Sequence, residues 1–104
     1  MKYRTLGKTD IKVSEIGLGC WAIGGPYWTK GESTGWTGEL DYDDIATAIS
    51  FAIDQGVNHF DTADVYGYGQ SERLLAKALG KRRNKAVIAT KVGWAATTAP
   101  HVYD

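Results

Sequence analysis

The most informative run in this chain is residues 57–67, which read VNHFDTADVYG. The first five of these residues predict a short strand, because they stand between Gly56 and a turn. The turn is indicated by Gly67 and Gly69, which follow the strand and favour a turn. Asp61 therefore ends a strand, and Tyr66 lies in the turn that follows it.

Helices are predicted on both sides of this run. The first begins at the N-cap Asp41, with Asp44 three residues later in the capping-box position, and stops at Gly56. One face of it is apolar at helical spacing, through Ile45, Ala48, Ile49, Ala52 and Ile53. The second helix begins near Ser71 and ends at Gly80. Its apolar side carries Leu74, Leu75, Ala78 and Leu79.

Strands are predicted elsewhere by short β-type segments. Residues 3–6 and 11–14 flank a GKTD turn and predict a β-hairpin, and residues 15–21 are a plausible buried strand. Residues 86–92, AVIATKV, are the clearest strand. Strands that alternate with helices predict an α/β fold whose parallel strands are buried on both faces. This pattern fits either an open doubly wound sheet or part of a (β/α)8 TIM barrel.

Residues 17–22, GLGCWA, formally match the dinucleotide-binding fingerprint G-x-G-x-x-G/A. That motif works where a helix N-terminus follows at once and meets the pyrophosphate. Here the next predicted helix begins only near Asp41. The glycines are better explained by close backbone packing at the end of the first strand.

Residues 22–40 show no helical or strand period, yet this region of the chain is rich in tryptophan and glycine. Loops of this length inside a domain are usually functional or disordered, and the tryptophans argue against disorder. We therefore expect a structured loop that covers something.

Three residues form the predicted catalytic group. Asp61 and Lys91 lie 30 residues apart, one strand-to-strand repeat, so they should meet at the carboxyl ends of neighbouring parallel strands. Taken singly, Asp61 could be a cap, Tyr66 a surface turn residue and Lys91 a solvated charge. A lysine within a buried strand, however, needs a partner, and Asp61 would be that partner.

This group suits the reduction of a carbonyl by hydride, which needs a proton for the developing alkoxide. A free phenol has a pKa of about 10, which is too high for efficient proton transfer near neutral pH. A nearby ammonium lowers the pKa of a phenol. A shift of two or three units requires about 3–4 kcal/mol, which one close charge in a dry site supplies.

Several motifs together resemble those of the aldo-keto reductase family, and they follow one another in the order that the family has. They are residues 3–9 (YRTLGKT), 13–19 (VSEIGLG), 58–67 (NHFDTADVYG), 71–72 (SE) and 88–93 (IATKVG). The resemblance implies the N-terminal portion of a (β/α)8 barrel and reduction of aldehydes, ketones or sugars with NADPH. It also implies that Tyr66 is the proton donor and that Lys91 and Asp61 tune the acidity of its hydroxyl group.

The resemblance further implies where the reactants lie. The cofactor would contact Gly19, Cys20, Trp21 and Asp61. The substrate pocket would be walled by residues 22–40 and by Trp21, Trp28 and Trp94. NADPH rather than NADH rests on the family alone, and no metal site is predicted.

Two histidines are further candidates for the site. The family places a catalytic histidine on the next strand, but His101 lies only ten residues after Lys91, and a crossover needs at least a dozen. His101 is therefore expected in a loop or a disordered tail. His59 shares the strand face of Asp61, about 6–7 Å deeper, and is expected to be a hydrogen-bonded interior residue.

The chain divides into a hairpin at 3–14, βα units at 15–56 and 57–80, a third strand at 86–92 and a tail at 95–104. A complete barrel takes about 250 residues, and this chain has 104. We therefore expect a fragment that is inactive alone and could self-associate through unpaired strand edges. The alternative is a non-catalytic binding, regulatory or oligomerising protein on the same fold.

Composition limits the other partners. Twelve Lys and Arg balance twelve Asp and Glu, so no net charge favours nucleic acid or an anionic membrane. The basic cluster at residues 81–85 is expected to be a solvated turn. Cys20 is the single cysteine, which fits a reducing compartment, and the chain shows neither a signal peptide nor a membrane-spanning run. A cytoplasmic protein is expected.

Overall fold

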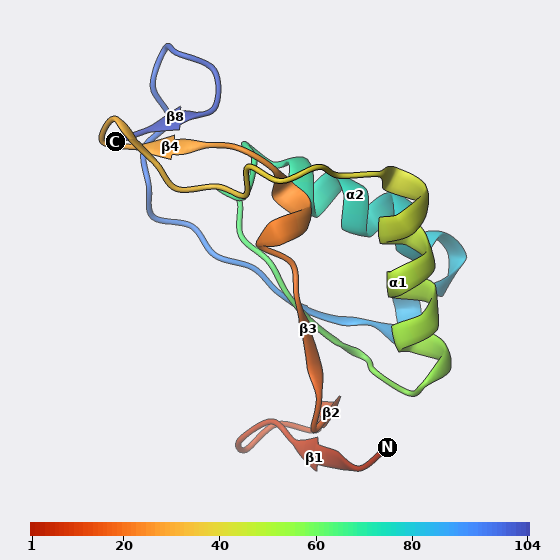
Figure 1. The fold of residues 1–104 in the computed structure, drawn as a ribbon. Coiled ribbons are helices and arrows are strands. Elements are labelled where there is room, and N and C mark those ends of the chain that lie inside the picture. Colours follow the sequence, from red (N-terminus) through yellow and green to blue (C-terminus); the bar gives the residue numbers. More distant parts are fainter.

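Three parallel strands form the centre of the molecule. The computed structural model describes residues 1–104, and in it β3 (Gly17–Gly19), β6 (His59–Asp61) and β7 (Val87–Ala89) pair in the order β3-β6-β7. Both pairings are parallel, as predicted from the alternation of strands and helices. Figure 1 shows both main helices on the same side of this sheet.

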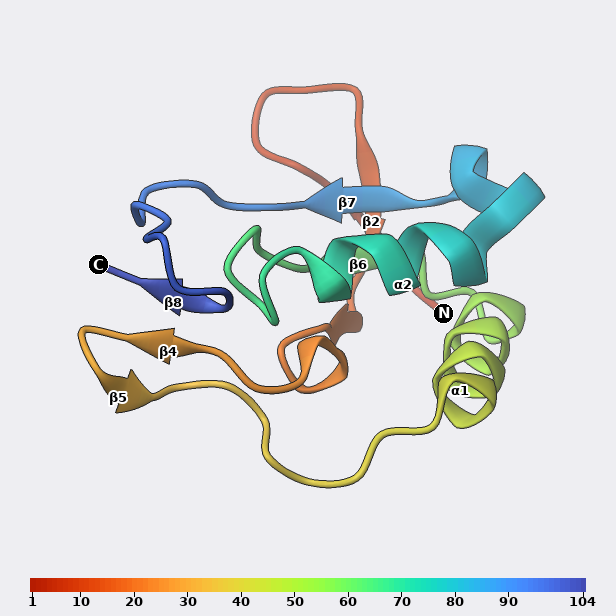
Figure 2. The same cartoon turned by 90° about the horizontal axis from the view of Figure 1, so that it is seen from above.

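The helices are α1 (Tyr42–Asp54) and α2 (Gln70–Leu79), the second continuing into the 3-10 segment η2 (Gly80–Lys85). Asp41 caps α1 as predicted: its carboxylate accepts hydrogen bonds from the backbone N–H groups of Asp43 and Asp44, at 2.8 and 3.2 Å. Figure 2 shows α1 and α2 lying against each other. Neither helix combines the length and the apolar character that crossing a bilayer requires.

The main core fills the space between the helices and the sheet. Phe60, at the middle of β6, is completely buried and has Leu18 and Ile88 beside it on the neighbouring strands. The buried members of this core are Cys20, Ile45, Ile49, Phe60, Leu75 and Leu79. Side chains of a strand alternate between its faces, so the residues on either side of Phe60 point away from the helices. The face that they form is therefore separate from the core.

That second face is open, although the parallel strands were predicted to be buried on both faces. It carries Gly17, His59 and Val87 in one row and Gly19, Asp61 and Ala89 in the next. All six residues are exposed or half-buried. No layer of the chain covers this side, which leaves Asp61 accessible.

The antiparallel pair β1 (Tyr3–Thr5) and β2 (Lys12–Ser14) lies at the end of the sheet where the strands begin (Figure 1). It is fastened there by Ser14 and Asn58. The Ser14 N–H donates to Asn58 Oδ1 at 2.7 Å, and the Asn58 N–H donates to Ser14 Oγ at 3.0 Å. The opposite end, where the strands stop, stays free for the site.

The segment after β3 has more structure than expected. Within residues 22–40 lie η1 (Ala22–Gly24), β4 (Trp28–Thr29) and β5 (Glu32–Ser33). The tail, expected to be a loop or disordered, supplies β8 (Val102–Tyr103), which pairs in parallel with β4. These two-residue strands have no periodic pattern of their own, so their pairing could not be predicted.

The third strand is shorter than predicted. The expected strand covered residues 86–92, but β7 ends at Ala89, and Val92 is 90% exposed. Hydrogen bonds to the segment after β6 still continue, from the Thr62 N–H to the Ala89 carbonyl at 2.8 Å and from the Asp64 N–H to the Lys91 carbonyl at 3.3 Å. The apolar composition therefore extends beyond the regular strand.

We expect Phe60→Ala to lower the free energy of unfolding by about 3–5 kcal/mol, because a fully buried aromatic ring is replaced by a cavity. Phe51→Ala is the matched control: Phe51 lies on α1 and is 64% exposed, so its loss should cost no more than about 0.5 kcal/mol. Urea unfolding followed by circular dichroism measures both changes. Equal effects of the two variants would show that the assigned core is wrong.

Candidate active site

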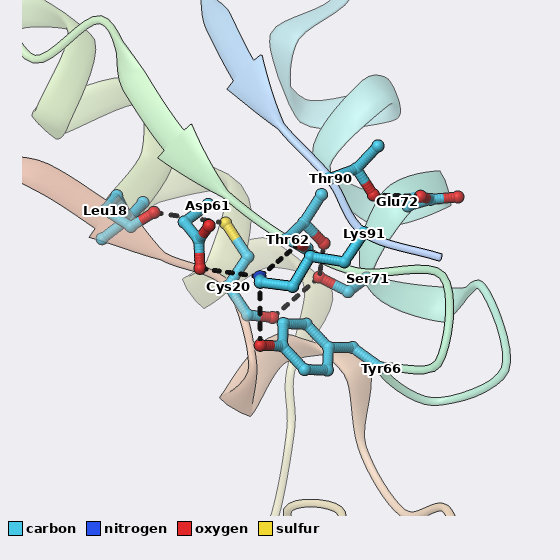
Figure 3. Close-up of polar contacts among 9 residues, drawn as sticks. All are labelled: Leu18, Cys20, Asp61, Thr62, Tyr66, Ser71, Glu72, Thr90 and Lys91. Atoms are coloured by element: carbon cyan, nitrogen blue, oxygen red, sulfur yellow. Dashed lines mark hydrogen bonds and ion pairs between the residues drawn. The ribbon is translucent and has the colours of Figure 1, made fainter. Parts of the chain in front are cut away.

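Lys91 and Asp61 form an ion pair at the carboxyl end of the parallel strands. Asp61 is the last residue of β6, and its register partner on β7 is Ala89, two residues before Lys91. The Lys91 Nζ lies 3.0 Å from Asp61 Oδ2 (Figure 3), and each side chain is about half exposed, at 50% and 49%. The structure thus brings together the two charges that the 30-residue spacing predicted.

The ammonium of Lys91 has two further acceptors. It donates to the main-chain carbonyl of Thr62 at 2.8 Å and to Tyr66 Oη at 3.4 Å, and it lies 5.1 Å from the centroid of the Tyr66 ring. Desolvation acts against the charged form. The hydrogen bonds with Asp61 and Tyr66 outweigh it and raise the pKa of Lys91 above its ordinary value. Lys91 is therefore a persistent cation at neutral pH.

Tyr66 is held in place by close backbone contact with η1. A Cβ atom added to Gly24 would lie 2.6 Å from the backbone carbonyl group of Tyr66. At Gly67, where φ is +65°, an added Cβ would lie within a bonding distance of the Gly24 carbonyl oxygen, at 1.6 Å. Any side chain at either position would push the two segments apart. Gly24 was not singled out from the sequence, although the Gly-Gly pair at 24–25 was the available signal.

A hollow of about 310 Å³ adjoins Tyr66 and Lys91. The two predicted site residues that line it with Lys91 are Tyr66 and Trp94. Its complete lining is Tyr27, Ala63, Asp64, Val65, Tyr66, Lys91, Val92, Gly93 and Trp94. The buried ring of Tyr27 lies 6.3 Å from the ring of Tyr66. Tyr27 belongs to residues 22–40, the loop that was expected to wall the substrate pocket, although the sequence did not single it out within that loop.

Two other predicted pocket residues lie apart from this hollow. Trp21 packs edge-on against Trp36, with ring centroids 6.1 Å apart. Trp28 lines a different hollow of about 330 Å³, together with Pro26 and His101. The structure therefore groups Trp94 with the ion pair but does not bring Trp28 to the hollow beside Tyr66.

Gly19 and Cys20, both predicted to contact the cofactor, face opposite sides of the sheet. A Cβ added to Gly19 would meet no atom within 4 Å, so the surface beside Asp61 is open there. The Cys20 side chain instead lies in the core, and burial, followed by the negative charge of Asp61, raises the pKa of its thiol to about 11. Cys20 is therefore a neutral thiol at physiological pH, and only its main chain is near the open face.

The two histidines do not join the ion pair. The half-buried His59 ring lies against Gly17, where an added Cβ would come within 3.2 Å of His59 Nδ1. His59 was expected to be a hydrogen-bonded interior residue, but it is half-buried and lies on the open face, where solvent can serve its nitrogens. His101 packs beside Tyr68, with ring centroids 5.5 Å apart. No cluster of His, Cys, Asp or Glu side chains could hold a metal ion.

The raised pKa of Cys20 predicts a pH-dependent stability. The unfolded thiol titrates near 9 and the folded one near 11, so the stabilising contribution is complete below pH 9 and is lost as pH rises toward 11. We expect the free energy of unfolding of the wild-type chain, relative to Cys20→Ala, to fall by about 2 kcal/mol between pH 8 and pH 11. Urea unfolding of both chains measures this, and the Lys91 contribution is common to both. A constant difference would contradict the assigned burial of the thiol.

Comparison with known proteins identifies the family to which this chain is similar. The model of the aldo/keto reductase family matches residues 15–103. The chain is 40% identical over 93 residues to the aldo-keto reductase YhdN of Bacillus subtilis, which covers 88% of this chain and 25% of that protein. It is 35% identical over 97 residues to a probable voltage-gated potassium channel subunit beta of Arabidopsis thaliana, covering 90% of this chain and 26% of that protein.

Solved structures show the same similarity. The holo form of an aldo-keto reductase from Bacillus halodurans matches with a TM-score of 0.77 at 31% identity, over 99% of this chain and 30% of that one. An aldo-keto reductase from Klebsiella pneumoniae in complex with NADPH matches with a TM-score of 0.61 at 27% identity, over 78% and 24%. The chain spans about a quarter of the length of the curated relatives that it matches. On the family match over most of its length, the chain belongs to the aldo/keto reductase family.

Proposed function

We propose that this chain supplies the catalytic residues Asp61, Tyr66 and Lys91 for NADPH-dependent reduction of aldehydes, ketones or sugars. The observation that carries the proposal is the position of one atom. The Lys91 Nζ lies 3.0 Å from Asp61 Oδ2 and 3.4 Å from Tyr66 Oη. The family membership supports an oxidoreductase, and the contacts of Lys91 indicate how its proton chemistry would work.

Each residue has a separate task in this proposal. Hydride addition to a carbonyl carbon leaves negative charge on the oxygen, and the Tyr66 hydroxyl donates its proton to that oxygen. The phenolate left on Tyr66 is stabilised by the adjacent ammonium of Lys91. Asp61 keeps that ammonium charged and fixed in position. A proton from water then restores the hydroxyl group of Tyr66.

The cofactor that supplies the hydride is NADPH in this proposal. The residues present fit a flat nicotinamide ring on the open face of the sheet, because Gly19 has no side chain and its surroundings are empty within 4 Å. Asp61 is half exposed beside it, and Trp21 at the start of η1 is 40% exposed. Cys20 would contribute its main chain, since its thiol is buried. The Klebsiella pneumoniae structure in complex with NADPH supports this choice of cofactor.

The substrate would enter the hollow between Tyr66 and Trp94. Its walls include the aromatic rings of Tyr27 and Trp94, which suit the apolar faces of sugars as well as aromatic aldehydes. The Lys30 Nζ lies 5.9 Å from the Trp94 ring centroid. Trp21 and Trp28 remain predicted pocket residues of the complete enzyme.

A second candidate function is non-catalytic binding, as a regulatory or oligomerising protein. It is favoured by the 35% identity with the plant protein named as a probable potassium channel subunit beta. The three-way contact of Lys91 favours the catalytic proposal, because a binding surface does not require an ammonium placed against a phenol. The two candidates are separated by whether Tyr66 matters for turnover.

The 104-residue chain can be assayed alone. We propose that it does not reduce carbonyls, because β3 and β7 have unpaired edges and the face around Asp61 is not closed, as it would be in a (β/α)8 barrel. Incubation with NADPH and a reactive aldehyde, followed by NADPH absorbance, should show no turnover. Turnover that disappears in Tyr66→Phe would contradict this proposal.

The catalytic roles of Asp61, Tyr66 and Lys91 can be tested in a complete barrel. This chain replaces the matching quarter of the Bacillus subtilis reductase, and the chimera is assayed with NADPH and an aromatic aldehyde. We expect turnover, which Tyr66→Phe lowers about a hundredfold to ten-thousandfold through loss of the proton donor. Tyr68→Phe is the matched control, since Tyr68 packs on His101 and Tyr103 rather than on Lys91. A folded chimera in which both variants behave alike would contradict the role of Tyr66.

A further inference from the structure

Two buried hydroxyl groups lie next to the ion pair. Ser71, in the first turn of α2, and Thr62, directly after β6, are both almost completely buried. The Ser71 hydroxyl donates to the Cys20 carbonyl oxygen at 2.7 Å, and Ser71 Oγ lies 2.8 Å from Thr62 Oγ1 (Figure 3). A serine hydroxyl has one proton to give, so the second bond runs from the Thr62 hydroxyl to Ser71 Oγ. The result is a directed chain from Thr62 through Ser71 to Cys20.

This chain of hydrogen bonds fixes the peptide that holds Lys91. Thr62 is tied to the next strand through its N–H, which donates to the Ala89 carbonyl at 2.8 Å. Its side chain is tied to α2 through Ser71. Its carbonyl oxygen, the remaining polar group, accepts from Lys91 Nζ at 2.8 Å, which is shorter than the 3.0 Å contact with Asp61. The position of that carbonyl is therefore set by groups that never touch Lys91.

The same network reaches Asp61 from the other side. The Cys20 N–H donates to the Asp61 carbonyl at 2.8 Å, while the Cys20 carbonyl receives the Ser71 hydroxyl. The main chains of Asp61 and Thr62, the two residues on the β6 side that accept from Lys91, are thus both linked to one buried serine. Removing its hydroxyl would leave the Thr62 hydroxyl and the Cys20 carbonyl unpaired in a dry region, and the backbone there would have to shift.

We propose that Ser71 and Thr62 are positioning residues, whose hydroxyl chain holds the Thr62 carbonyl where the Lys91 ammonium needs it. The functional meaning rests on the proposed catalytic role of Lys91. The claim that the hydroxyl groups position the Thr62 carbonyl does not depend on that catalytic role. If the two hydroxyls only fasten α2 to the sheet, their loss lowers stability and leaves Lys91 unchanged. If they position Lys91, their loss changes the environment of its ammonium in chains that are still folded.

The experiment is an NMR titration of the 104-residue chain with isotope-labelled lysine, in which the Lys91 signal is assigned by its absence from Lys91→Arg. Thr62→Val keeps the side-chain shape and removes the hydroxyl, and Ser71→Ala removes the central link. In both we expect the Lys91 pKa to fall, because a displaced Thr62 carbonyl no longer accepts from the ammonium, and losing a hydrogen bond to the charged form disfavours that form. Thr62→Ser, which retains the hydroxyl, should restore the wild-type titration.

Ser14→Ala is the control for stability loss alone. Ser14 is also buried and also makes two hydrogen bonds, to the Ile16 carbonyl and from the Asn58 N–H, but it lies at the opposite end of the strands. It should destabilise the chain without moving the Lys91 titration. If Ser71→Ala does not fold, Thr62→Val decides the question.

A wild-type Lys91 titration in folded Thr62→Val would overturn the proposal, and so would a shift of the same size in Ser14→Ala. The titration needs no turnover, so it is independent of the chimera assay. An inactive chimera overturns the proposed reductase function, whereas an unchanged titration overturns the positioning role of the hydroxyls.

Discussion

The site depends on one ammonium group that is shared among three oxygen atoms. Lys91 donates to a carboxylate, a main-chain carbonyl and a phenol, which come from the end of β6 and the turn after it. Its side chain is half exposed, so water weakens the attraction between its charge and that of Asp61. Coulomb energy alone would not hold this geometry at such exposure. The acceptors must instead be fixed by the fold, which makes the backbone after β6 the controlling element.

The parallel register explains how one strand serves both stability and chemistry. Phe60 points to the helices and is fully buried, whereas its neighbour Asp61 points to the open face. A shift of the register by one residue would exchange these roles, placing a carboxylate in the core and a phenyl ring at the site. The core around Phe60 therefore fixes the orientation of Asp61. Gly19, the register partner of Asp61, leaves the open face uncrowded beside the carboxylate, since an added Cβ there would meet no atom within 4 Å.

The sequence predicted the parts of this arrangement that local patterns and spacing encode. The capped helix after Asp41, the parallel order of the strands and the meeting of Asp61 with Lys91 all follow from periodicity and repeat length. The pairing of β4 with β8 could not be predicted, because it joins residues 28–29 to residues 102–103 with two residues on each side. Main-chain acceptors such as the Thr62 carbonyl carry no signature in any sequence. The openness of the second sheet face is likewise a property of what packs there, not of the strands.

Positioning of the polar groups and exclusion of water are separate requirements, and this chain meets the first more fully than the second. It places the ammonium, the carboxylate and the phenol at hydrogen-bonding distances without any other part of a barrel. Stabilisation of a phenolate by a nearby cation grows as water is excluded, because the effective dielectric constant falls. The open face beside Asp61 admits water, so the same three residues would act more strongly once that face is covered. The polar contacts of the proposed site thus lie within residues 61–91, and the strength of the proposed catalysis depends on how well solvent is excluded from the open face.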